Sequence, residues 1–347
     1  MAPAVNTVMI AGIAGASLGT EIAKSLHLAG GYRILGCDIS PLAYGHFDAH
    51  FDATFQADAA DYTASVTRLC REQGVSVLIP GGERPAQILG QATVELATQG
   101  IRIAQNDPGV VALASDKARC FERLAELGLP CPRTVTLRTA QDARSAPLPC
   151  IVKPSVDSGG SSFVFFARTA QEAELYTAYL LANGIAPVAQ AYLPEAGGEF
   201  TVGVLSTPEG SIAGSIALRR VFHNKLSVSA RGADFLISSG YSQGRIEDFP
   251  AIRATCEDIA RALGSRGPLN VQGRVDADGT FVPFEINPRF SASTYLRALA
   301  GFGEVDHFLH LMAGTAPPPL EVRPGWYLRT LSETAVTSTA ADPATDP

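Results

Sequence analysis

Oxygen-bearing side chains recur near the end of the chain at a spacing that suits a hard metal ion. Glu285 and Asn287 lie two residues apart in the apolar run 281–287, so a β-strand would place both on one face. If that strand pairs with the preceding one through the turn at 276–279, Gln272 arrives beside them. Carboxylate and amide oxygens of this kind suit Mg²⁺, or Mn²⁺ in its place. The alternative is that these polar side chains at strand ends are simply solvated.

A lysine followed by small residues could bind phosphate. Lys153 ends a β-branched strand, and the loop after it contains Ser158, Gly159 and Gly160. Exposed N–H groups and hydroxyls bind phosphate oxygens, and a nearby ammonium offsets their charge. The pattern is not the P-loop motif, so the loop would hold phosphate in a different geometry. An ordinary hairpin turn beside a surface lysine explains the same residues.

Several charged side chains are candidates for contact with a substrate. Arg289 follows the oxygen-rich strand and supplies a planar cation that fits a carboxylate or phosphoryl oxygen. Arg219, Arg220 and Arg231 could clamp a carboxylate between them, or could be solvated charges on a β-hairpin. Glu83, in a turn after an N-terminal strand, could reach an amine, although a polar turn residue is the plainer explanation.

A glycine turn near the N-terminus raises a different possibility. Gly12, Gly15 and Gly19 lie between a predicted strand and a predicted helix, and Asp38 ends the next strand. A dinucleotide-binding domain keeps its ribose carboxylate at that position, so a dehydrogenase is one hypothesis. The spacing is G-x-x-G-x-x-x-G rather than G-x-G-x-x-G, and any tight turn recruits glycine for conformational reasons.

The composition bounds the classes of protein to consider. The 347 residues are 46% hydrophobic and 18% charged, which is typical of folded globular proteins and excludes wholesale disorder. With 27 Lys and Arg against 34 Asp and Glu, the net charge of -7 argues against a broad nucleic-acid or membrane surface. The six cysteines are scattered without metal-binding spacing, and no transmembrane or signal segment is expected, so we expect a cytoplasmic protein.

The elements that must position these residues follow two different patterns. Up to about residue 104, strands predicted at 7–13, 33–38 and 75–80 alternate with helices predicted at 18–29, 62–73 and 85–99. This alternation predicts a parallel sheet covered on both faces, and so an α/β first domain.

The rest of the chain reads differently. Ser115 is the expected N-cap of a helix that runs to Gly128. From residue 150 onward strands dominate, with helices expected at 169–183 and 248–263, which predicts an α+β region around a mostly antiparallel sheet. Residues 331–347 lose apolar periodicity and are expected to form a disordered tail.

Four segments, in this order, resemble the ATP-grasp superfamily over residues 5–328. They are Ser-Asp-Lys-Ala-Arg at 115–119, Val-Lys-Pro-Ser-x-x-Ser-Gly-Gly-Ser at 152–161, Gln-Ala-Tyr-Leu-Pro-x-x-Gly-Gly-Glu-Phe-Thr-Val at 190–202, and Phe-Glu-Ile-Asn-Pro-Arg-Phe-Ser at 284–291. The chain looks most like the synthetase units of carbamoyl-phosphate synthase large chains and stand-alone carboxylate-amine ligases. The resemblance implies a Rossmann-like pre-ATP-grasp domain at 1–106, a central lid subdomain at 107–190 and a C-terminal catalytic subdomain at 191–330.

The resemblance also implies roles for individual residues. Lys117, Arg119 and Lys153 would contact ATP phosphates, and Gly159 and Gly160, with Ser158, would form a lid over them. Gln190, Tyr192 and Leu193 would lie along the adenine edge, Glu199 would hold the ribose, and His223 would be a nucleotide contact unless it is a surface histidine. Gln272, Glu285 and Asn287 match metal-holding positions, Arg289 matches an arginine near the transferred phosphoryl group, and Ser291 would lie at the substrate.

The expected activity is that of an ATP-dependent ligase that joins a small carboxylate to an amine through an acyl phosphate, releasing ADP and phosphate. Ala292 stands where carbamoyl-phosphate synthases tend to carry a second arginine, which weakens an inference of bicarbonate chemistry. Carboxylate or carbamate phosphorylation of that type and a non-catalytic nucleotide-binding protein are the alternatives. Superfamily members are often dimers, so a homodimer is possible for this chain too.

Overall fold

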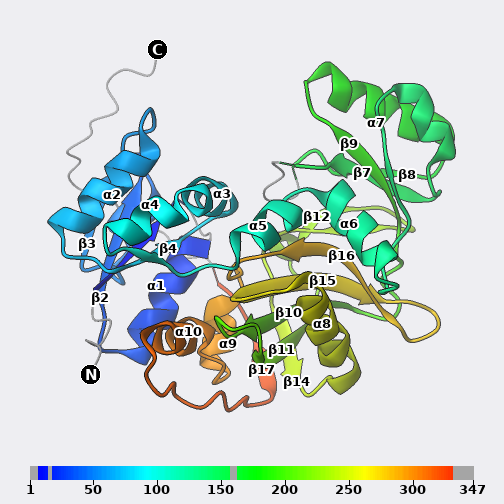
Figure 1. Cartoon of the computed structure of the whole chain (residues 1–347). Helices are drawn as coiled ribbons and strands as arrows, with labels where there is room; N and C mark the ends of the chain where they lie inside the picture. The colour runs from blue at the N-terminus through cyan, green and yellow to red at the C-terminus, as the bar shows by residue number, and fades with distance from the viewer. Residues whose placement is uncertain (1–6, 15–17, 157–161, 331–347) are drawn as a thin grey trace.

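Residues 7–14, 18–156 and 162–330 are described in this computed structural model of the protein. Three β-rich units follow one another along the chain, and Figure 1 shows them as a blue unit at the left, a green lobe at the upper right and a larger sheet below it. The expected tail at 331–347 and Gly15 lie outside the described residues.

The first unit is a parallel sheet, as the alternating pattern predicts. Within the described residues its strands run in the order β3-β2-β1-β4-β5, and every pair of neighbours is parallel. The strands are β1 (Thr7–Ala11), β2 (Arg33–Asp38), β3 (Ala53–Gln56), β4 (Val77–Pro80) and β5 (Arg102–Ile103). The helices around them are α1 (Leu18–Ala29), α2 (Tyr62–Glu72), α3 (Glu83–Gln91) and α4 (Thr93–Thr98), with a 3-10 turn at Tyr44–Phe47.

Alternation along β1 divides the buried side chains of this unit between two faces. Val8 and Ile10 belong to one hydrophobic cluster with Ile22 of α1, whereas Met9 belongs to another with Leu69 of α2. Because successive strand residues point to opposite faces, helices must cover both sides of the sheet. The carboxyl ends of β1 and β4 are thereby left as an edge on which polar residues can gather.

The middle unit is a small antiparallel sheet flanked by helices. Its strands run in the order β6-β9-β7-β8, and Figure 1 shows helix α7 beside them in the upper lobe. The elements are α5 (Pro108–Ala114), α6 (Lys117–Glu126), β6 (Thr134–Thr136), a 3-10 turn at Ala140–Ser145, β7 (Cys150–Pro154), β8 (Phe165–Ala167), α7 (Ala170–Ala182) and β9 (Pro187–Ala191).

The last unit is a larger antiparallel sheet in the order β16-β15-β10-β11-β14-β17, with a separate two-stranded sheet, β12-β13. Its elements are β10 (Glu199–Ser206), β11 (Ile212–Arg220), a 3-10 turn at Lys225–Ser227, β12 (Val228–Arg231), β13 (Leu236–Ser238), β14 (Gly244–Glu247), α8 (Pro250–Leu263), β15 (Pro268–Val275), β16 (Phe281–Asn287), α9 (Thr294–Leu299), α10 (Glu304–Ala313) and β17 (Gly325–Tyr327). Together with the middle unit this is an ATP-grasp fold, which confirms the expected fold class.

The first and last units share a core. Helix α1 packs against α9 and α10, and Ile22 belongs to the same hydrophobic cluster as Phe302 and Phe308 (Figure 1). Tyr32 reinforces this contact because its hydroxyl donates to the Asp306 carboxylate at 2.5 Å. The N-terminal sheet is therefore docked on the C-terminal unit rather than tethered to it by a linker alone.

Some sequence expectations need correction. Residues 85–99 were expected to form one helix but break into α3 and α4, and the helix after residue 114 is capped by Asp116 rather than Ser115. The Asp116 carboxylate accepts from the Ala118 amide at 3.0 Å, which satisfies a donor at the helix start. No described helix is long and apolar enough to cross a membrane.

Candidate functional site

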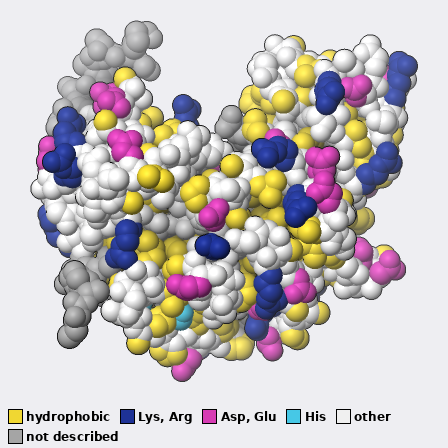
Figure 2. Space-filling model, viewed as in Figure 1, with side chains coloured by type: hydrophobic (Ala, Val, Ile, Leu, Met, Phe, Trp, Pro, Cys, Tyr) yellow, Lys and Arg dark blue, Asp and Glu magenta, His cyan; other side chains and the backbone are white. Residues whose placement is uncertain are grey.

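Two connected cavities lie where the three units meet. The inner cavity, of about 180 Å³, is lined by β7, β9, β13, β15 and β16 together with Lys117 at the start of α6. The outer cavity, of about 750 Å³, lies at the carboxyl edge of the N-terminal sheet. Ser239, Gly240, Arg289 and Ala292 line both cavities. Figure 2 shows the surface hollowed between the N-terminal unit and the β6–β9 lobe.

A buried carboxylate flanked by two arginines holds the inner cavity together. Glu199 on β10 is 1% exposed, and its two oxygens accept from Arg220 at 2.8 Å and from Arg274 at 2.8 and 2.9 Å. Both arginines are buried as well, so each needs this counter-charge. On one side of β10, Glu199 lies directly opposite Arg274 of β15. On the other side, Phe200 pairs with Arg219 of β11, so the next residue, Arg220, lies beside Glu199.

Other guanidinium hydrogens tie four backbone carbonyls to this cluster. Arg220 donates to the carbonyls of Ser239 at 2.7 Å and Tyr241 at 3.2 Å. Arg274 donates to the carbonyls of Leu193 and, at 2.7 Å, of Leu236. Fixed donors of this kind orient backbone that would otherwise be free to move. The segments that line the inner cavity at 193 and 236–241 are therefore positioned by one ion cluster.

The ribose role predicted for Glu199 stays a prediction, and in this structure the carboxylate pairs with arginines. Its side chain has no exposed surface, both of its oxygens accept from arginines, and it is not among the residues that line the inner cavity. A carboxylate in that state is a structural counter-ion, because taking it from the arginines would leave two buried cations unpaired.

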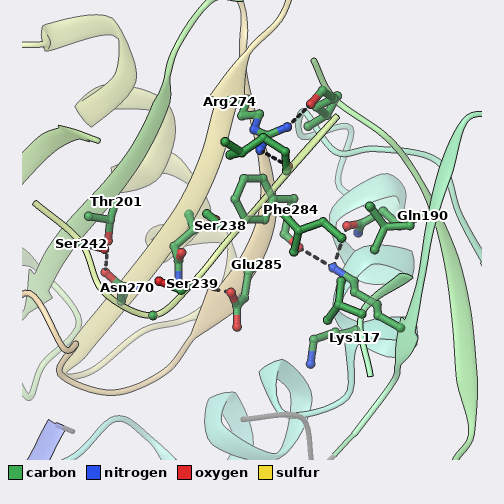
Figure 3. Close-up of a pocket in the computed structure, with 18 of the residues that line it drawn as sticks. Lys117, Gln190, Thr201, Ser238, Ser239, Ser242, Asn270, Arg274, Phe284 and Glu285 are labelled. Atoms are coloured by element: carbon green, nitrogen blue, oxygen red, sulfur yellow. Dashed lines mark hydrogen bonds between the residues drawn. The ribbon is translucent and has the colours of Figure 1, made fainter. Parts of the chain in front are cut away.

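Lys153 is the buried cation of the inner cavity. It is 7% exposed, and its ammonium donates to the Gln190 side-chain oxygen at 2.8 Å and to the Phe284 carbonyl at 2.9 Å (Figure 3). Burial and, to a smaller extent, the nearby Lys117 lower the pKa of Lys153 to about 7, although Glu285 acts in the opposite direction. A phosphate group in the cavity would favour the protonated form.

Lys117 reaches the same space from another element. It begins α6, and its backbone amide donates to the Ser155 carbonyl at 2.9 Å, just beyond β7. The Ser155 hydroxyl in turn donates to the Asp116 cap at 2.6 Å. Figure 3 shows Lys117 and Glu285 projecting toward the same opening. The helix cap thus sets the distance between the two lysines that line the inner cavity.

The oxygen cluster predicted from the sequence is assembled in part. Gln272 and Glu285 are directly opposite each other across β15 and β16, and the Gln272 amide nitrogen lies 3.2 Å from the Glu285 carboxylate. Both line the inner cavity. Asn287 pairs with Asn270 in the same register, but its side-chain oxygen accepts from Arg289 at 3.3 Å and it is not among the lining residues.

These residues fit a magnesium ion that is shared with a bound phosphate. Mg²⁺ is usually held by one or two carboxylates plus substrate phosphates rather than by an all-protein cage. Glu285 supplies one carboxylate on the cavity wall, beside the Gln272 amide. Among the described residues no group of three His, Cys, Asp or Glu side chains is arranged to hold a metal.

Arg289 stands at the junction of the two cavities. It donates to the Phe290 carbonyl at 3.0 Å and to the Asn287 side chain. Its Nε–H is buried and has no hydrogen-bond partner among the described residues. Arg220, Arg297 and Arg329 also have a buried Nε–H without a partner, but of these four arginines only Arg289 lines the two cavities. Arg289 is therefore placed to contact an anion that passes between the cavities.

The outer cavity collects the carboxyl-edge residues of the N-terminal sheet. Gly12, Asp38, Glu83 and Arg84 line it together with apolar side chains. The Asp38 carboxylate accepts from the Ile13 amide at 2.7 Å and the Ser40 amide at 3.0 Å, so it is holding the turn rather than awaiting a ribose.

The glycines of this turn have a steric explanation that needs no dinucleotide. A Cβ on Gly19 would lie 2.1 Å from the Gly12 carbonyl oxygen, and one on Gly81 would lie 2.0 Å from it. Gly12 itself has φ of +97°, which favours glycine. These contacts favour the turn interpretation over the dehydrogenase hypothesis.

Four predicted site residues lie away from both cavities. Arg119, His223, Arg219 and Arg231 are exposed and are not among the lining residues. Arg219 and Arg220 alternate along β11, so Arg220 is buried while Arg219 points outward, and Arg231 lies 3.8 Å from Glu195 on the surface. The three-arginine clamp is therefore not assembled. Ser158, Gly159 and Gly160 lie outside the described residues.

The other predicted residues lie where expected, and some lining residues were missed. Gln190, Tyr192, Leu193 and Ser291 line the inner cavity. The Tyr192 amide donates to the Pro149 carbonyl at 2.9 Å and the Tyr192 hydroxyl accepts from the Leu236 amide at 2.8 Å, so both groups are engaged within the protein. Residues that the sequence analysis did not select are Thr201, Ser239, Asn270, Arg274 and Phe284. Asn270 and Arg274 stand two residues either side of Gln272 on one strand, and that period was the available signal.

With the geometry established, comparison with known families classifies the chain. The model of one family, described as an ATP-grasp domain, matches residues 114–293. The chain belongs to the ATP-grasp family, a family of ATP-binding ligases. The matched range contains Lys117, Lys153, Gln272, Glu285 and Arg289, the residues that stand around the inner cavity.

Individual relatives and solved structures are similar to this chain at low sequence identity. The carbamoyl phosphate synthase large chain of Rubrobacter xylanophilus is 28% identical over 255 residues, which is 71% of this chain and 23% of the relative. This chain therefore spans about a quarter of the length of that curated relative. A PurK N5-carboxyaminoimidazole ribonucleotide synthetase, solved with ADP, shares the fold with a TM-score of 0.70 at 16% identity, covering 92% of this chain and 80% of that one. An L-amino acid ligase from Bacillus licheniformis does so with a TM-score of 0.68 at 15% identity, covering 93% and 78%.

The depressed pKa of Lys153 makes a prediction about stability and pH. Between pH 7 and 8.5 the unfolded chain keeps the Lys153 proton while the folded protein loses it, so the unfolding free energy should rise with pH. Relative to Lys153→Met, whose side chain does not titrate, wild type should gain about 1 to 2 kcal/mol over this window. Urea unfolding of both proteins at pH 6, 7, 8 and 8.5 measures the difference.

Stopping at pH 8.5 matters for this comparison because burial raises the pKa of several cysteines, such as Cys150, which would act in the opposite direction at higher pH. A constant difference between wild type and Lys153→Met from pH 6 to 8.5 would show that Lys153 stays protonated in the folded protein.

Proposed function

We propose that this protein is an ATP-dependent carboxylate-amine ligase that phosphorylates a carboxylate and then forms an amide bond. Its proposed substrates are amino-acid-like small molecules. The observation that carries the proposal is the position of Arg289, which lines both cavities and keeps a buried Nε–H without a partner. A transferable phosphoryl group held on one side of Arg289 and an acceptor held on the other would meet at that guanidinium.

In this proposal the inner cavity binds the nucleotide. Lys153 and Lys117 offset the negative charge of the phosphates, and the low local dielectric around Lys153 strengthens that interaction. Tyr192, Leu193 and Phe284 give the cavity apolar surface next to the lysines, as an adenine ring requires. The solved ADP complex of the PurK synthetase, which has the same fold, supports this location in general terms.

Glu285 and Gln272 are the proposed magnesium-facing residues. When bound, Mg²⁺ neutralises phosphate charge and polarises the phosphoryl oxygens. The part played by the chain is orientation: the β15–β16 pairing fixes Glu285 opposite Gln272, and the Gln272 side-chain oxygen lies 3.5 Å from Arg220 of the buried ion cluster. At the end of β16, the Asn287 side-chain oxygen accepts from Arg289 and so orients its guanidinium.

The proposed chemistry has two steps. A carboxylate oxygen of the acid attacks the γ-phosphorus, the bond to the β-γ bridging oxygen breaks, and ADP leaves. An amine nitrogen then attacks the acyl carbon, phosphate leaves with the former carboxylate oxygen, and the nitrogen loses a proton. No side-chain nucleophile is required, because positioning and charge stabilisation supply the catalysis. The enclosed cavity would also limit hydrolysis of the acyl phosphate.

The outer cavity is the proposed acceptor site, in which the acid receives the phosphoryl group and the amine then attacks. The acidic side chain of Glu83 and the basic ones of Arg84 and Arg289 suit the two ends of a zwitterion. Leu18, Ile39, Tyr62, Pro85 and Ile88 are among its apolar lining residues and suit a hydrocarbon side chain. The fold shared with an L-amino acid ligase supports an amino-acid-like substrate. In this proposal residues 1–106 supply the acceptor wall, 107–190 the lid and 191–330 the catalytic sheet.

Carbamoyl-phosphate-type chemistry is the second candidate, and the similarity to carbamoyl phosphate synthase large chains favours it. An outer cavity of about 750 Å³ is much larger than bicarbonate requires, which favours the amide ligase. A non-catalytic nucleotide-binding role would not explain why Arg289, which lines the inner cavity with Glu285 and Lys153, also lines the outer one.

The ligase proposal predicts ADP release that depends on both substrates. With Mg·ATP and a panel of amino acids, singly and in pairs, wild type should release ADP and phosphate and form an amide detectable by mass spectrometry. Lys153→Ala and Glu285→Ala should each lower turnover about 100-fold or more, because each removes a charge that faces the phosphates.

Arg68→Gln on the exposed face of α2 is the matched control and should turn over like wild type, since Arg68 is 65% exposed and lines neither cavity. Near wild-type turnover in both Lys153→Ala and Glu285→Ala would sink the assignment. ADP release with bicarbonate alone, without an amide product, would favour the second candidate.

The acceptor assignment predicts a separate effect at Glu83. Glu83→Gln should raise KM for the amine substrate about tenfold, because a charge-assisted hydrogen bond to an ammonium becomes a neutral one. KM for Mg·ATP should stay the same, since Glu83 lines the outer cavity only. Steady-state kinetics of Glu83→Gln and of the exposed control Glu95→Gln measure both constants. An unchanged KM for the amine would remove Glu83 from the acceptor site.

A further inference from the structure

Arg329 joins three elements around the outer cavity, although it lies outside the range that matches the ATP-grasp model. Its guanidinium pairs with Glu21 of α1 at 3.0 Å, donates to the Ala292 carbonyl, and lies over the Tyr241 ring with its carbon 5.1 Å from the ring centre. Both side chains of the ion pair are nearly buried, with exposed fractions of 9% for Arg329 and 5% for Glu21.

Each of these partners belongs to a wall of the outer cavity. Ala292 and Tyr241 line it directly, and Leu18, which also lines it, lies one turn before Glu21 on α1. The wall formed by α1 belongs to the N-terminal unit, whereas Ala292 and Tyr241 belong to the C-terminal unit. One cation thus bridges the two halves of the cavity, beside the packing of α1 on α9 and α10.

The segment that carries Tyr241 is held from both sides. Arg220, part of the buried ion cluster, donates to the Ser239 and Tyr241 carbonyls, while Arg329 packs against the Tyr241 ring. Ser239 lines both cavities. A segment fixed at its backbone by Arg220 still needs a contact that orients its side chain, and a guanidinium over an aromatic ring supplies one.

A nearby arginine provides a comparison that shows what is particular to Arg329. Arg323, in the same C-terminal segment, is exposed and donates to the Leu299 carbonyl at 2.8 Å. It also fastens the segment to the C-terminal unit, but among the described residues its side-chain hydrogen bond goes neither to a carboxylate of α1 nor to a residue that lines the outer cavity.

We propose that Arg329 is a positioning residue for the acceptor: by bonding Glu21, Ala292 and Tyr241 at once, it fixes the outer cavity at the width that presents the acceptor to Arg289. This inference rests on the proposed function, because it assumes that the outer cavity holds the acceptor. Arg329 itself is not among the residues that line the cavity, so its effect is exerted through the walls.

The test compares Arg329→Gln, Arg329→Lys and the control Arg323→Gln. With the acid and amine pair that gives wild type its highest turnover, Arg329→Gln should raise KM for the acceptor about tenfold or more, while KM for Mg·ATP stays within about twofold. Arg329→Lys keeps the charge beside Glu21 but cannot reach three partners. Its KM for the acceptor should therefore lie between the values of wild type and Arg329→Gln. Arg323→Gln should match wild type.

Hydrogen exchange supplies a readout that does not need a substrate. In Arg329→Gln, amides in peptides covering 239–243 and 289–293 should exchange about tenfold faster than in Arg323→Gln, whereas β15 and β16 should be unchanged. Arg329→Lys reports on these local effects even if Arg329→Gln is too unstable to purify.

The outcomes separate the two claims. If wild type releases no ADP with any acid and amine, the proposed function fails, and exchange at 239–243 still decides whether Arg329 positions the wall. If wild type is active but the acceptor KM and the exchange of Arg329→Gln equal those of Arg323→Gln, the role of Arg329 is overturned. Equal rises in KM for acceptor and Mg·ATP would also overturn it, because they indicate general loosening.

Discussion

The structure of the site depends on one buried carboxylate. Glu199 pairs with both Arg220 and Arg274 in the interior, and these arginines also donate to the carbonyls of residues 193, 236, 239 and 241. Removing one member of such a cluster leaves an unpaired buried charge, which typically costs about 3 to 5 kcal/mol. The loops around the inner cavity are therefore ordered by ion pairs and hydrogen bonds on the side that faces away from the cavity. Their cavity-facing surfaces are left for a ligand.

That frame explains how three units make one site. β7 of the middle unit brings Lys153 to the Phe284 carbonyl of the C-terminal unit, and Arg289 continues β16 toward the carboxyl edge of the N-terminal sheet. The inner cavity is rich in cations and adjoins Glu285, whereas the outer cavity mixes both charges with apolar walls. Charge thus separates a phosphate region from an acceptor region, and Arg289 is common to both.

Sequence patterns predicted this arrangement best where local periodicity determined it. The period of two along β16 and the short turn before it were enough to place Glu285 beside Gln272, and alternating segments were enough for the parallel sheet. The ion pairs of Glu199 were not predicted, because nothing in its own strand reveals that Arg220 and Arg274 would enclose it from neighbouring strands. The same alternation that buries Arg220 turns Arg219 outward, so a cluster in sequence was divided between two faces. Arg329 was out of reach because its partners lie far away in the chain.

The central claim is that a carboxylate receives the γ-phosphoryl group at Arg289 before the amine attacks. The most direct measurement is transfer of ¹⁸O from the labelled carboxylate of the acid substrate into the inorganic phosphate released during a single turnover. Because the acyl phosphate would lose phosphate together with the former carboxylate oxygen, the account predicts one ¹⁸O in each phosphate formed. Unlabelled phosphate accompanying amide formation, or release of AMP and pyrophosphate instead of ADP, would contradict it.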